Sequence, residues 1–224
     1  MNFSTDKADK AAENIYQQFA KAIGSGKNTL WLISGGSAIN LQVAIMRRLH
    51  QTLPDKLSLL TILPVDERFG PVGHENSNTS QMKASGFEPA DAQWYDVLAE
   101  NLPMSETVAL YAGLAEDAFA SAEVVIATLL MGADGHTAGI LPGSPAITDT
   151  TSTAVGYEWS DFTRLTLGVT MLLKIDQAYI LAYGDSKKKA LNRLKDNSEP
   201  IEALPAKLLY DIAEVTVYND YINT

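Results

Sequence analysis

The stretch that decides the fold is Val124-Val125-Ile126-Ala127-Thr128-Leu129-Leu130-Met131, followed at once by Gly132-Ala133-Asp134-Gly135-His136-Thr137-Ala138. The first part is an almost unbroken apolar run, which is typical of a strand buried on both faces of a parallel sheet covered by helices. The second part is a glycine-flanked turn that carries a carboxylate and an imidazole. Because ligands of open α/β sheets bind beyond the carboxyl ends of the strands, this turn is predicted to lie in an active site.

The alternation of apolar strands and amphipathic helices continues in both directions from this segment. Expected strands span residues 29–33, 57–65, 94–98, 165–167, 178–183 and 215–218, and expected helices span residues 4–23, 39–49, 105–120, 200–210 and a stretch from 186 onward. Strands that alternate with helices pair in parallel through right-handed crossovers. No repeat, low-complexity segment or linker interrupts the pattern, so we expect one α/β domain over residues 1–224 with a mostly parallel sheet.

Composition narrows the class of protein. Hydrophobic residues make up 46% of the chain and charged residues 20%, which is ordinary for a globular protein. No apolar run approaches the roughly 20 residues that span a bilayer, and no signal-peptide pattern opens the chain, so we expect a cytoplasmic protein without membrane contact. The formal net charge of -10 argues against a nucleic-acid partner. The lack of cysteine excludes disulfides, thiolate nucleophiles and thiolate metal sites.

Two turns that follow predicted strands suit an anion. Ser34-Gly35-Gly36-Ser37 lies between a strand and a helix, where glycine lets main-chain N–H groups approach an anion at the positive end of the helix. Gly184-Asp185-Ser186-Lys187-Lys188-Lys189 places ammonium groups at a second strand-to-helix turn, where a lysine can meet a phosphate. Each pattern alone also fits a structural role, namely a tight turn in the first case and a solvated helix face in the second.

Two further turns carry titratable groups. Asp66-Glu67-Arg68 follows an apolar strand and fits a site or a solvated charge cluster equally well. Of the three histidines, His50 ends an amphipathic helix and His74 lies in a polar loop, whereas His136 lies in the turn after an apolar strand. The imidazole of His136 can accept a proton near neutral pH, and Asp134 can fix its tautomer. No second histidine stands at ligand spacing, so no metal site is expected, and no Gly-x-Ser-x-Gly elbow supports a serine hydrolase.

Taken in order, these four turns resemble the 6-phosphogluconolactonase family, within the larger group that includes glucosamine-6-phosphate deaminase. The resemblance runs nearly end to end and also rests on Ser77-Asn78, Leu141-Pro142-Gly143 and Arg164-Leu165-Thr166-Leu167. It implies a modified Rossmann-like, three-layer sandwich and a site that holds a phosphorylated sugar lactone without metal or cofactor.

The resemblance also implies an activity and roles for individual residues. The activity is hydrolysis of 6-phospho-D-glucono-1,5-lactone to 6-phosphogluconate, a reaction of the oxidative pentose phosphate pathway. His136 would be the general base that activates water, supported by Asp134, with Asp66 and Arg68 lining the site. The residues expected to bind substrate and phosphate are Gly35, Gly36, Ser37, Arg164 and Lys187. A δ-lactone is electrophilic enough that one positioned base suffices, which suits a chain without an obvious covalent nucleophile.

Several positions depart from the usual family pattern and leave the lactone preference open. Ala38-Ile39 stands where Thr-Pro is common, Gly70 where Val is usual, and Gly139 where Ser commonly follows the His-Thr-Ala run. The first departure could alter the geometry of the phosphate loop, and the last removes a hydroxyl near the predicted base.

Two alternative functions remain open. Deaminases or isomerases of the glucosamine-6-phosphate type share the Asp-Gly-His turn but carry an acidic residue shortly after it, in an Asn-Glu-Pro context. This chain has Ile140-Leu141-Pro142-Gly143 there, and it has Arg68 where those enzymes have tyrosine. The other alternative is a non-catalytic sugar-phosphate-binding protein, against which the intact Asp134 and His136 weigh. The sequence does not determine the oligomeric state.

Overall fold

The centre of the fold is a seven-stranded, fully parallel sheet in the order β1-β10-β9-β6-β2-β3-β5. The computed structural model describes residues 1–224. The strands of this sheet are β1 (Asn2–Ser4), β2 (Thr29–Ile33), β3 (Leu60–Pro64), β5 (Gln93–Trp94), β6 (Val124–Leu130), β9 (Gln177–Ala182) and β10 (Glu214–Asn219). The apolar run that the sequence marks as a doubly covered strand is β6, and its interior is buried throughout.

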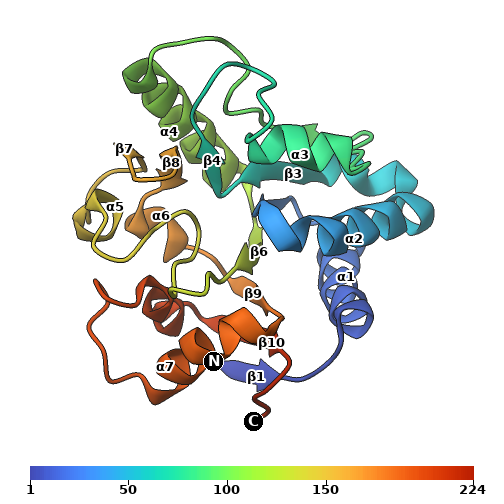
Figure 1. Cartoon of the computed structure of the whole chain (residues 1–224). Coiled ribbons are helices and arrows are strands. Elements are labelled where there is room, and N and C mark those ends of the chain that lie inside the picture. The colour runs from blue at the N-terminus through green and yellow to red at the C-terminus, as the bar shows by residue number, and fades with distance from the viewer.

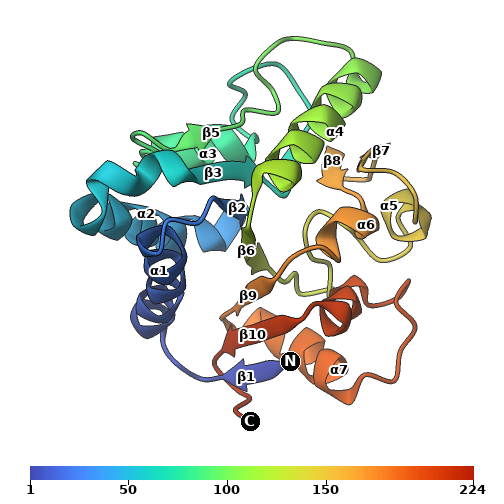
Figure 2. The same ribbon diagram turned by 180° about the vertical axis from the view of Figure 1, so that it is seen from behind.

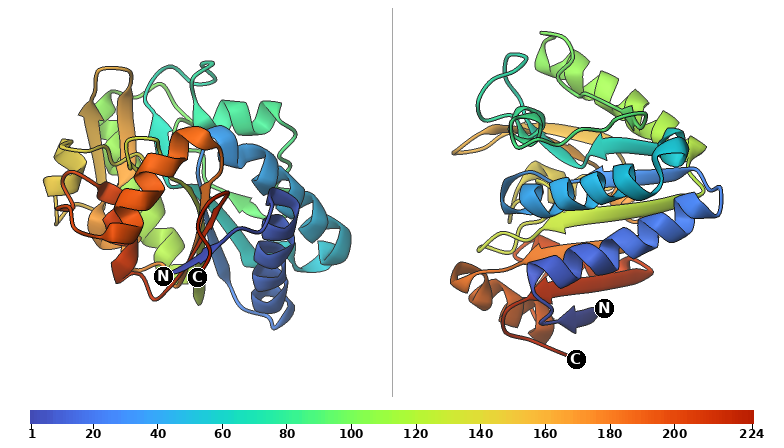
Figure 3. Two further views of the ribbon diagram at one scale, coloured as in Figure 1. Left: turned by 60° about the horizontal axis from the view of Figure 1, so that its bottom comes forward. Right: turned by 90° about the vertical axis from the view of Figure 1, so that its right-hand side faces the viewer.

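Helices cover both faces of this sheet and complete a three-layer sandwich (Figure 3). On one face lie α1 (Ala8–Gly24) and α2 (Ile39–Thr52), and on the other lie α4 (Met104–Ser121), α6 (Val169–Leu172) and α7 (Lys188–Asp196). None of the helices combines the length and the apolar character needed to cross a membrane. The sandwich is the α/β architecture expected from the alternating pattern of the sequence.

Side chains of the central strands alternate between the two apolar layers. Along β2, Leu30 and Leu32 belong to the core on the α4 side, whereas Trp31 and Ile33 belong to the core on the α1 and α2 side. This alternation follows from the pleat of a strand, which sends successive side chains to opposite faces. A strand covered on both faces must therefore be apolar at nearly every position, as β2 and β6 are.

A second, antiparallel sheet stands beside the parallel one. Its order is β4 (Asp66–Arg68), β8 (Thr163–Leu167), β7 (Ala154–Glu158). The long helix α4 packs against β7 and β8, so both sheets share one hydrophobic core (Figure 2). The short helices α3 (Asn78–Ala84) and α5 (Pro145–Thr148) lie in the connections next to this sheet.

Several expected elements differ from those observed. Pro54 opens a 3₁₀ turn over Pro54–Leu59, so the strand expected from residue 57 begins only at Leu60. The strand expected at 94–98 contracts to Gln93–Trp94, and the expected helix at 200–210 is a 3₁₀ turn over Pro205–Asp211. The N-terminal helix begins at Ala8 because residues 2–4 pair with β10 as an edge strand.

The expectation of parallel pairing was wrong for residues 165–167, which belong to the antiparallel strand β8. The strands β4 and β7 were not predicted. β4 has only three residues, all charged, so neither an apolar run nor an alternating pattern marks it in the sequence. β4 is a strand only because it pairs with β8. That pairing is a long-range contact, which the local sequence pattern cannot predict.

The order of the strands fixes where a ligand can bind. From β2 the chain moves outward to β3 on one side, whereas β6 occupies the other side of β2 and is followed in the sheet by β9 and β10 (Figure 1; Figure 2 labels β2). The connections that leave the carboxyl ends of β2 and β6 therefore diverge. Such a topological switch point opens a crevice at the edge of an α/β sheet.

Candidate active site

The turn that follows β6, residues 132–138, brings Asp134 and His136 together. The main-chain N–H of Gly132 donates to the carbonyl of His136 at 2.8 Å and closes the turn. Oδ1 of Asp134 lies 2.7 Å from Nδ1 of His136 and accepts the main-chain N–H of the same residue at 3.1 Å. A Cβ at Gly132 would lie 2.1 Å from Nδ1, so only glycine fits there. The carboxylate thus selects the Nδ1–H tautomer and leaves Nε2 to exchange a proton.

The charge state of Asp134 suits this arrangement. Partial burial raises its pKa, but the hydrogen bond from His136 and the positive charge of a protonated imidazole outweigh burial and hold the pKa at about 2. Asp134 is therefore ionised at neutral pH. A carboxylate in this position orients the ring and stabilises the imidazolium that forms when Nε2 takes up a proton.

Arg193 of α7 braces the 132–138 turn from outside. Its Nη1 donates to the main-chain carbonyl of Asp134 at 2.9 Å, while Nε and Nη2 form a bidentate pair with Glu199 at 2.6 Å each. Gly135 has a φ of +92°, and a Cβ there would lie 2.1 Å from Leu204. These contacts tie the turn to the C-terminal part of the chain, and no pattern around residue 134 had indicated them.

The antiparallel sheet supplies the opposite wall of the site. Pairing of β4 with β8 sets Asp66 opposite Thr166 and Arg68 opposite Arg164. Since side chains alternate along a strand, these four side chains share one face. The hydroxyl of Thr166 donates to the carbonyl of Ala138 at 2.5 Å, which joins this wall to the end of the 132–138 turn.

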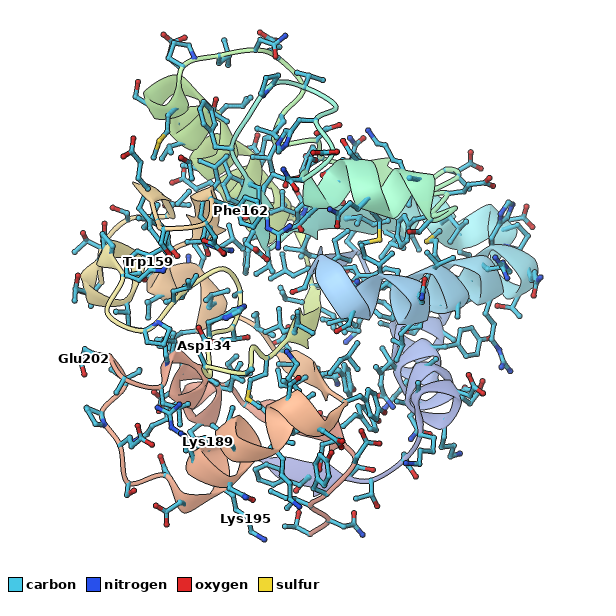
Figure 4. All side chains as sticks on the ribbon, in the orientation of Figure 1. Asp134, Trp159, Phe162, Lys189, Lys195 and Glu202 are labelled. Carbon is cyan, nitrogen blue, oxygen red and sulfur yellow. The ribbon has the colours of Figure 1, made fainter.

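Arg68 and Arg164 place two positive charges next to one another on this wall. Nη2 of Arg164 pairs with Asp161 at 2.6 Å, and Nη1 of Arg68 donates to the carbonyl of Asn76 at 3.1 Å. The ring of Phe162 lies 5.1 Å from the guanidinium carbon of Arg68 and 5.6 Å from that of Arg164, and Figure 4 shows it near β4. Both Nε atoms lack a hydrogen-bond partner. Like charges directly opposite one another are unfavourable, so this wall favours an anion.

Asp66 is the buried carboxylate of the site, with an exposed fraction of 8%. Burial raises its pKa, and the charges of Arg68, Arg164 and His136 and a hydrogen bond from Asn78 oppose that rise. Because these influences act in opposite directions, the charge of Asp66 depends on the positions of its neighbours. Such a perturbed group in a cleft is a candidate for acid–base or binding chemistry.

The two walls enclose one cavity at the switch point. The predicted residues that line it are Gly35, Asp66, Arg68, His136 and Arg164. Its volume of about 30 Å³ leaves room for at least one water molecule. No group of three or more histidine and carboxylate side chains is arranged to hold a metal ion.

The other predicted phosphate ligands lie beside the cavity. Gly36 and Ser37 form the exposed 3₁₀ turn before α2, and Ser37 lines a separate surface pocket between α1 and α2. Lys187 is half-buried in the turn after β9. Burial lowers its pKa, and the charge of Asp134 opposes that change, so Lys187 lies on the Asp134 side of the site.

Gln42 of α2 fixes the connection that leaves β2. Its Nε2 donates to the carbonyl of Ser34 at 2.6 Å, and its Oε1 accepts the N–H of Ser34 at 3.2 Å and the hydroxyl of Thr128 at 2.7 Å. Nε1 of Trp31 donates to the same hydroxyl at 2.9 Å. This buried network holds Gly35 at the edge of the cavity, although Gln42 had no predicted role.

Glu67 also had no predicted role, and it lies on the face of β4 opposite Asp66. Its fully buried carboxylate accepts the N–H groups of Asn78 at 2.6 Å and Thr79 at 2.9 Å and the hydroxyl of Ser77 at 3.0 Å. Burial raises its pKa, and these donors oppose the rise. A carboxylate at a helix N-terminus is favourable, so Glu67 attaches α3 to β4. Because residues 66–68 are all charged, no pattern in the sequence separates Glu67 from Asp66.

Two of the departures from the family pattern have local structural reasons. A Cβ at Gly70 would lie 2.9 Å from the ring of His74, whose Nε2 contacts the carbonyl of Arg68 at 2.9 Å. Gly139 has a φ of +70°, and a Cβ there would lie 2.6 Å from Cβ of Asp66. Each glycine therefore makes room for a side chain at the edge of the site.

The comparisons with known proteins agree with this architecture. The family model of glucosamine-6-phosphate isomerases/6-phosphogluconolactonase matches residues 4–218. No curated protein sequence matches the chain. Among solved structures, 6-phosphogluconolactonase from Thermotoga maritima is 19% identical, with a TM-score of 0.79 and coverage of 97% of this chain and 97% of that chain.

Structures of two different activities are similar to this chain to the same degree. A 6-phosphogluconolactonase from Shewanella baltica OS155 is 19% identical with a TM-score of 0.80, over 98% of this chain and 96% of that chain. A monomeric glucosamine-6-phosphate deaminase is 21% identical with a TM-score of 0.80, over 99% of this chain and 98% of that chain. At these identities the similarity shows the fold. Because the family model covers almost the whole chain, the protein belongs to the family of glucosamine-6-phosphate isomerases and 6-phosphogluconolactonases.

Proposed function

We propose that the protein hydrolyses 6-phospho-D-glucono-1,5-lactone to 6-phosphogluconate, a reaction of the oxidative pentose phosphate pathway, through water activated by His136. The observation that carries the proposal is the Asp134–His136 pair at 2.7 Å, whose imidazole faces the cavity opposite two arginines. This arrangement combines a proton acceptor with a wall that attracts an anionic sugar.

The reaction needs no covalent enzyme intermediate. Nε2 of His136 takes a proton from water while the water oxygen bonds to the lactone carbonyl carbon. The imidazolium is stabilised by Asp134 until the tetrahedral intermediate collapses. The bond from the carbonyl carbon to the ring oxygen then breaks, and the ring oxygen takes the proton from His136. The product is the open-chain acid, and the base is regenerated.

The positive charges have separate tasks in this proposal. Arg68 stabilises the oxyanion that develops on the carbonyl oxygen or holds the sugar near Asp66. Arg164 and Lys187 bind the phosphate, together with the main chain and hydroxyl of residues 35–37. Guanidinium groups suit this task because they donate two parallel hydrogen bonds to a phosphate. The unpartnered Nε atoms of Arg68 and Arg164 support such a role.

One observation favours lactone hydrolysis over the deaminase reaction. Deaminases of this type carry an acid shortly after the Asp-Gly-His turn, in an Asn-Glu-Pro context, whereas the residue before Pro142 here is Leu141, which is buried in the hydrophobic core. A carboxylate at this place would be desolvated without a partner. This observation favours lactone hydrolysis. The deaminase reaction and non-catalytic binding of a sugar phosphate are the two alternatives that the same experiment tests.

The experiment is an assay of the purified protein with freshly prepared 6-phosphogluconolactone, with the spontaneous hydrolysis rate subtracted. We expect acceleration without added metal or nucleotide and an unchanged rate after chelation. Glucosamine-6-phosphate is assayed in parallel for release of ammonia. Ammonia release without lactone hydrolysis would identify a deaminase, and binding of either sugar without turnover would identify a binding protein. Loss of activity on chelation, restored by a divalent ion, would overturn the cofactor-free mechanism.

A further inference from the structure

Asn78, the first residue of α3, contacts both sides of the crevice. Its Nδ2 donates to the main-chain carbonyl of Asp66 at 2.9 Å and to Oδ2 of the Asp66 carboxylate at 3.4 Å. On the other side, its Oδ1 occupies the space above Gly35, where a Cβ would lie only 1.9 Å away. Asn78 is 3% exposed. Its amide therefore fills the gap between β4 and the connection that leaves β2.

The orientation of the amide follows from its neighbours. If the amide were turned over, Oδ1 would face the carbonyl of Asp66, and two acceptors would meet. Nδ2 must therefore point to Asp66. Oδ1 then has no hydrogen-bond partner, although burying an unpaired amide oxygen costs free energy. The side chain is thus poorly optimised for stability and well placed for holding Asp66.

The main chain of Asn78 is fixed independently of its side chain. Glu67, which points away from the cavity, accepts the N–H of Asn78 at 2.6 Å and the N–H of Thr79 at 2.9 Å. The start of α3 is in this way attached to β4, the strand that carries Asp66. Because its main chain is anchored to β4, the amide of Asn78 lies at a fixed distance from Asp66.

We propose that Asn78 is a positioning residue that holds the Asp66 carboxylate in the cavity and aligns it with the Gly35 connection. Its side chain makes the only side-chain hydrogen bond to the Asp66 carboxylate. The titratable groups that act on or face Asp66 from the surrounding elements are Arg68 of β4, Arg164 of β8, His136 of the 132–138 turn, Tyr157 of β7 and Tyr111 of α4. Only the activity readout of this inference rests on the proposed function.

The first test follows the ionisation of Asp66 directly, by the carboxyl ¹³C titration of the protein, with Asp66→Asn used to assign the signal. Asn78→Ala removes a hydrogen bond to the ionised carboxylate, so the pKa of Asp66 should rise. Asn78→Asp adds a like charge and should raise it further. Ser77→Ala is the matched control, because it removes the cap of α3 and a hydroxyl bonded to Glu67 without touching Asp66. This control should lower the melting temperature and leave the titration of Asp66 unchanged.

The second test is kinetic. Asn78→Ala should lower kcat for the lactone by about tenfold with a smaller change in KM, and in an Asp66→Asn background it should have no further effect. If Asn78→Ala does not fold, Asn78→Ser is measured in its place. An unchanged titration of Asp66 in the folded variant, or an equal change in Ser77→Ala, would overturn the positioning role. A shifted titration in a protein without lactonase activity would sustain the positioning role and refute the proposed function.

Discussion

The two walls of the cavity are built in different ways. The 132–138 turn is closed by contacts between near neighbours in the sequence, Gly132 with His136 and Asp134 with His136. The opposite wall exists only because β4 and β8 pair and set Arg68 across from Arg164. The first wall places a proton acceptor and the second gathers positive charge. Local sequence can therefore specify a reacting group, whereas an anion-binding surface requires distant segments to meet.

The largest expected effect tests whether His136, in the 132–138 turn, is the general base. His136→Ala should lower kcat by roughly 10²–10⁴-fold, the usual contribution of a positioned general base, with a smaller effect on KM. His50→Ala, at an exposed position of α2, is the control and should behave as the wild type. Steady-state kinetics with the spontaneous rate subtracted provide the measurement. A folded His136→Ala protein with wild-type kcat would move the role of base away from the turn, and Asp66 would be the next carboxylate to test.

The next effect tests whether positive charge binds the phosphate. Arg164→Ala and Lys187→Ala should each raise KM for the phosphorylated lactone by about 10–100-fold, which corresponds to roughly 1–3 kcal/mol of lost charge-assisted hydrogen bonding. The unphosphorylated lactone should be affected little. Arg47→Ala, exposed on α2 and without an ion pair, should change neither substrate. Equal losses for both lactones would show that these residues serve the chemistry or the fold.

A smaller effect distinguishes the contribution of Asp134 to catalysis from that of His136. Asp134→Asn keeps the shape of the side chain but removes the negative charge that stabilises the imidazolium, so kcat should fall by about tenfold while the protein remains folded. KM should change less than kcat. Circular dichroism and kinetics on the same preparation provide the measurement. If kcat stayed at the wild-type value, Asp134 would only shape the turn.

The smallest effect concerns stability at acid pH. The pKa of Asp134 is held at about 2 in the folded protein against an ordinary value of 3.8, so its ionised form favours the folded state. That contribution is fully present above pH 3.8 and is lost as the pH falls toward 2. The melting temperature of Asp134→Asn should therefore lie below that of the wild type above pH 4, and the two should converge near pH 2. Because the side chain is about half exposed, the difference will be small. A constant difference across this range would contradict the assignment.

The sequence by itself determined the parallel sheet and one wall of the site. An apolar run such as residues 124–131 can only be a doubly covered strand or a buried helix, and the following glycines end it in a turn. The two-residue spacing of Asp134 and His136 brings their side chains together within that turn. Amphipathic periodicity likewise marked α1, α2 and α4, with differences only at their ends. These features depend on interactions between residues close in sequence.

The tertiary structure alone decided the other wall. β4 is too short and too charged to show a strand pattern, and its register with β8 decides that Arg68 meets Arg164 while Glu67 turns away to α3. The same holds for the contact from Arg193 to Asp134 and for the position of Ser37 beside the cavity. The physical reason is common to all of them. Each depends on a contact between segments far apart in sequence, which forms only when the hydrophobic core brings those segments together.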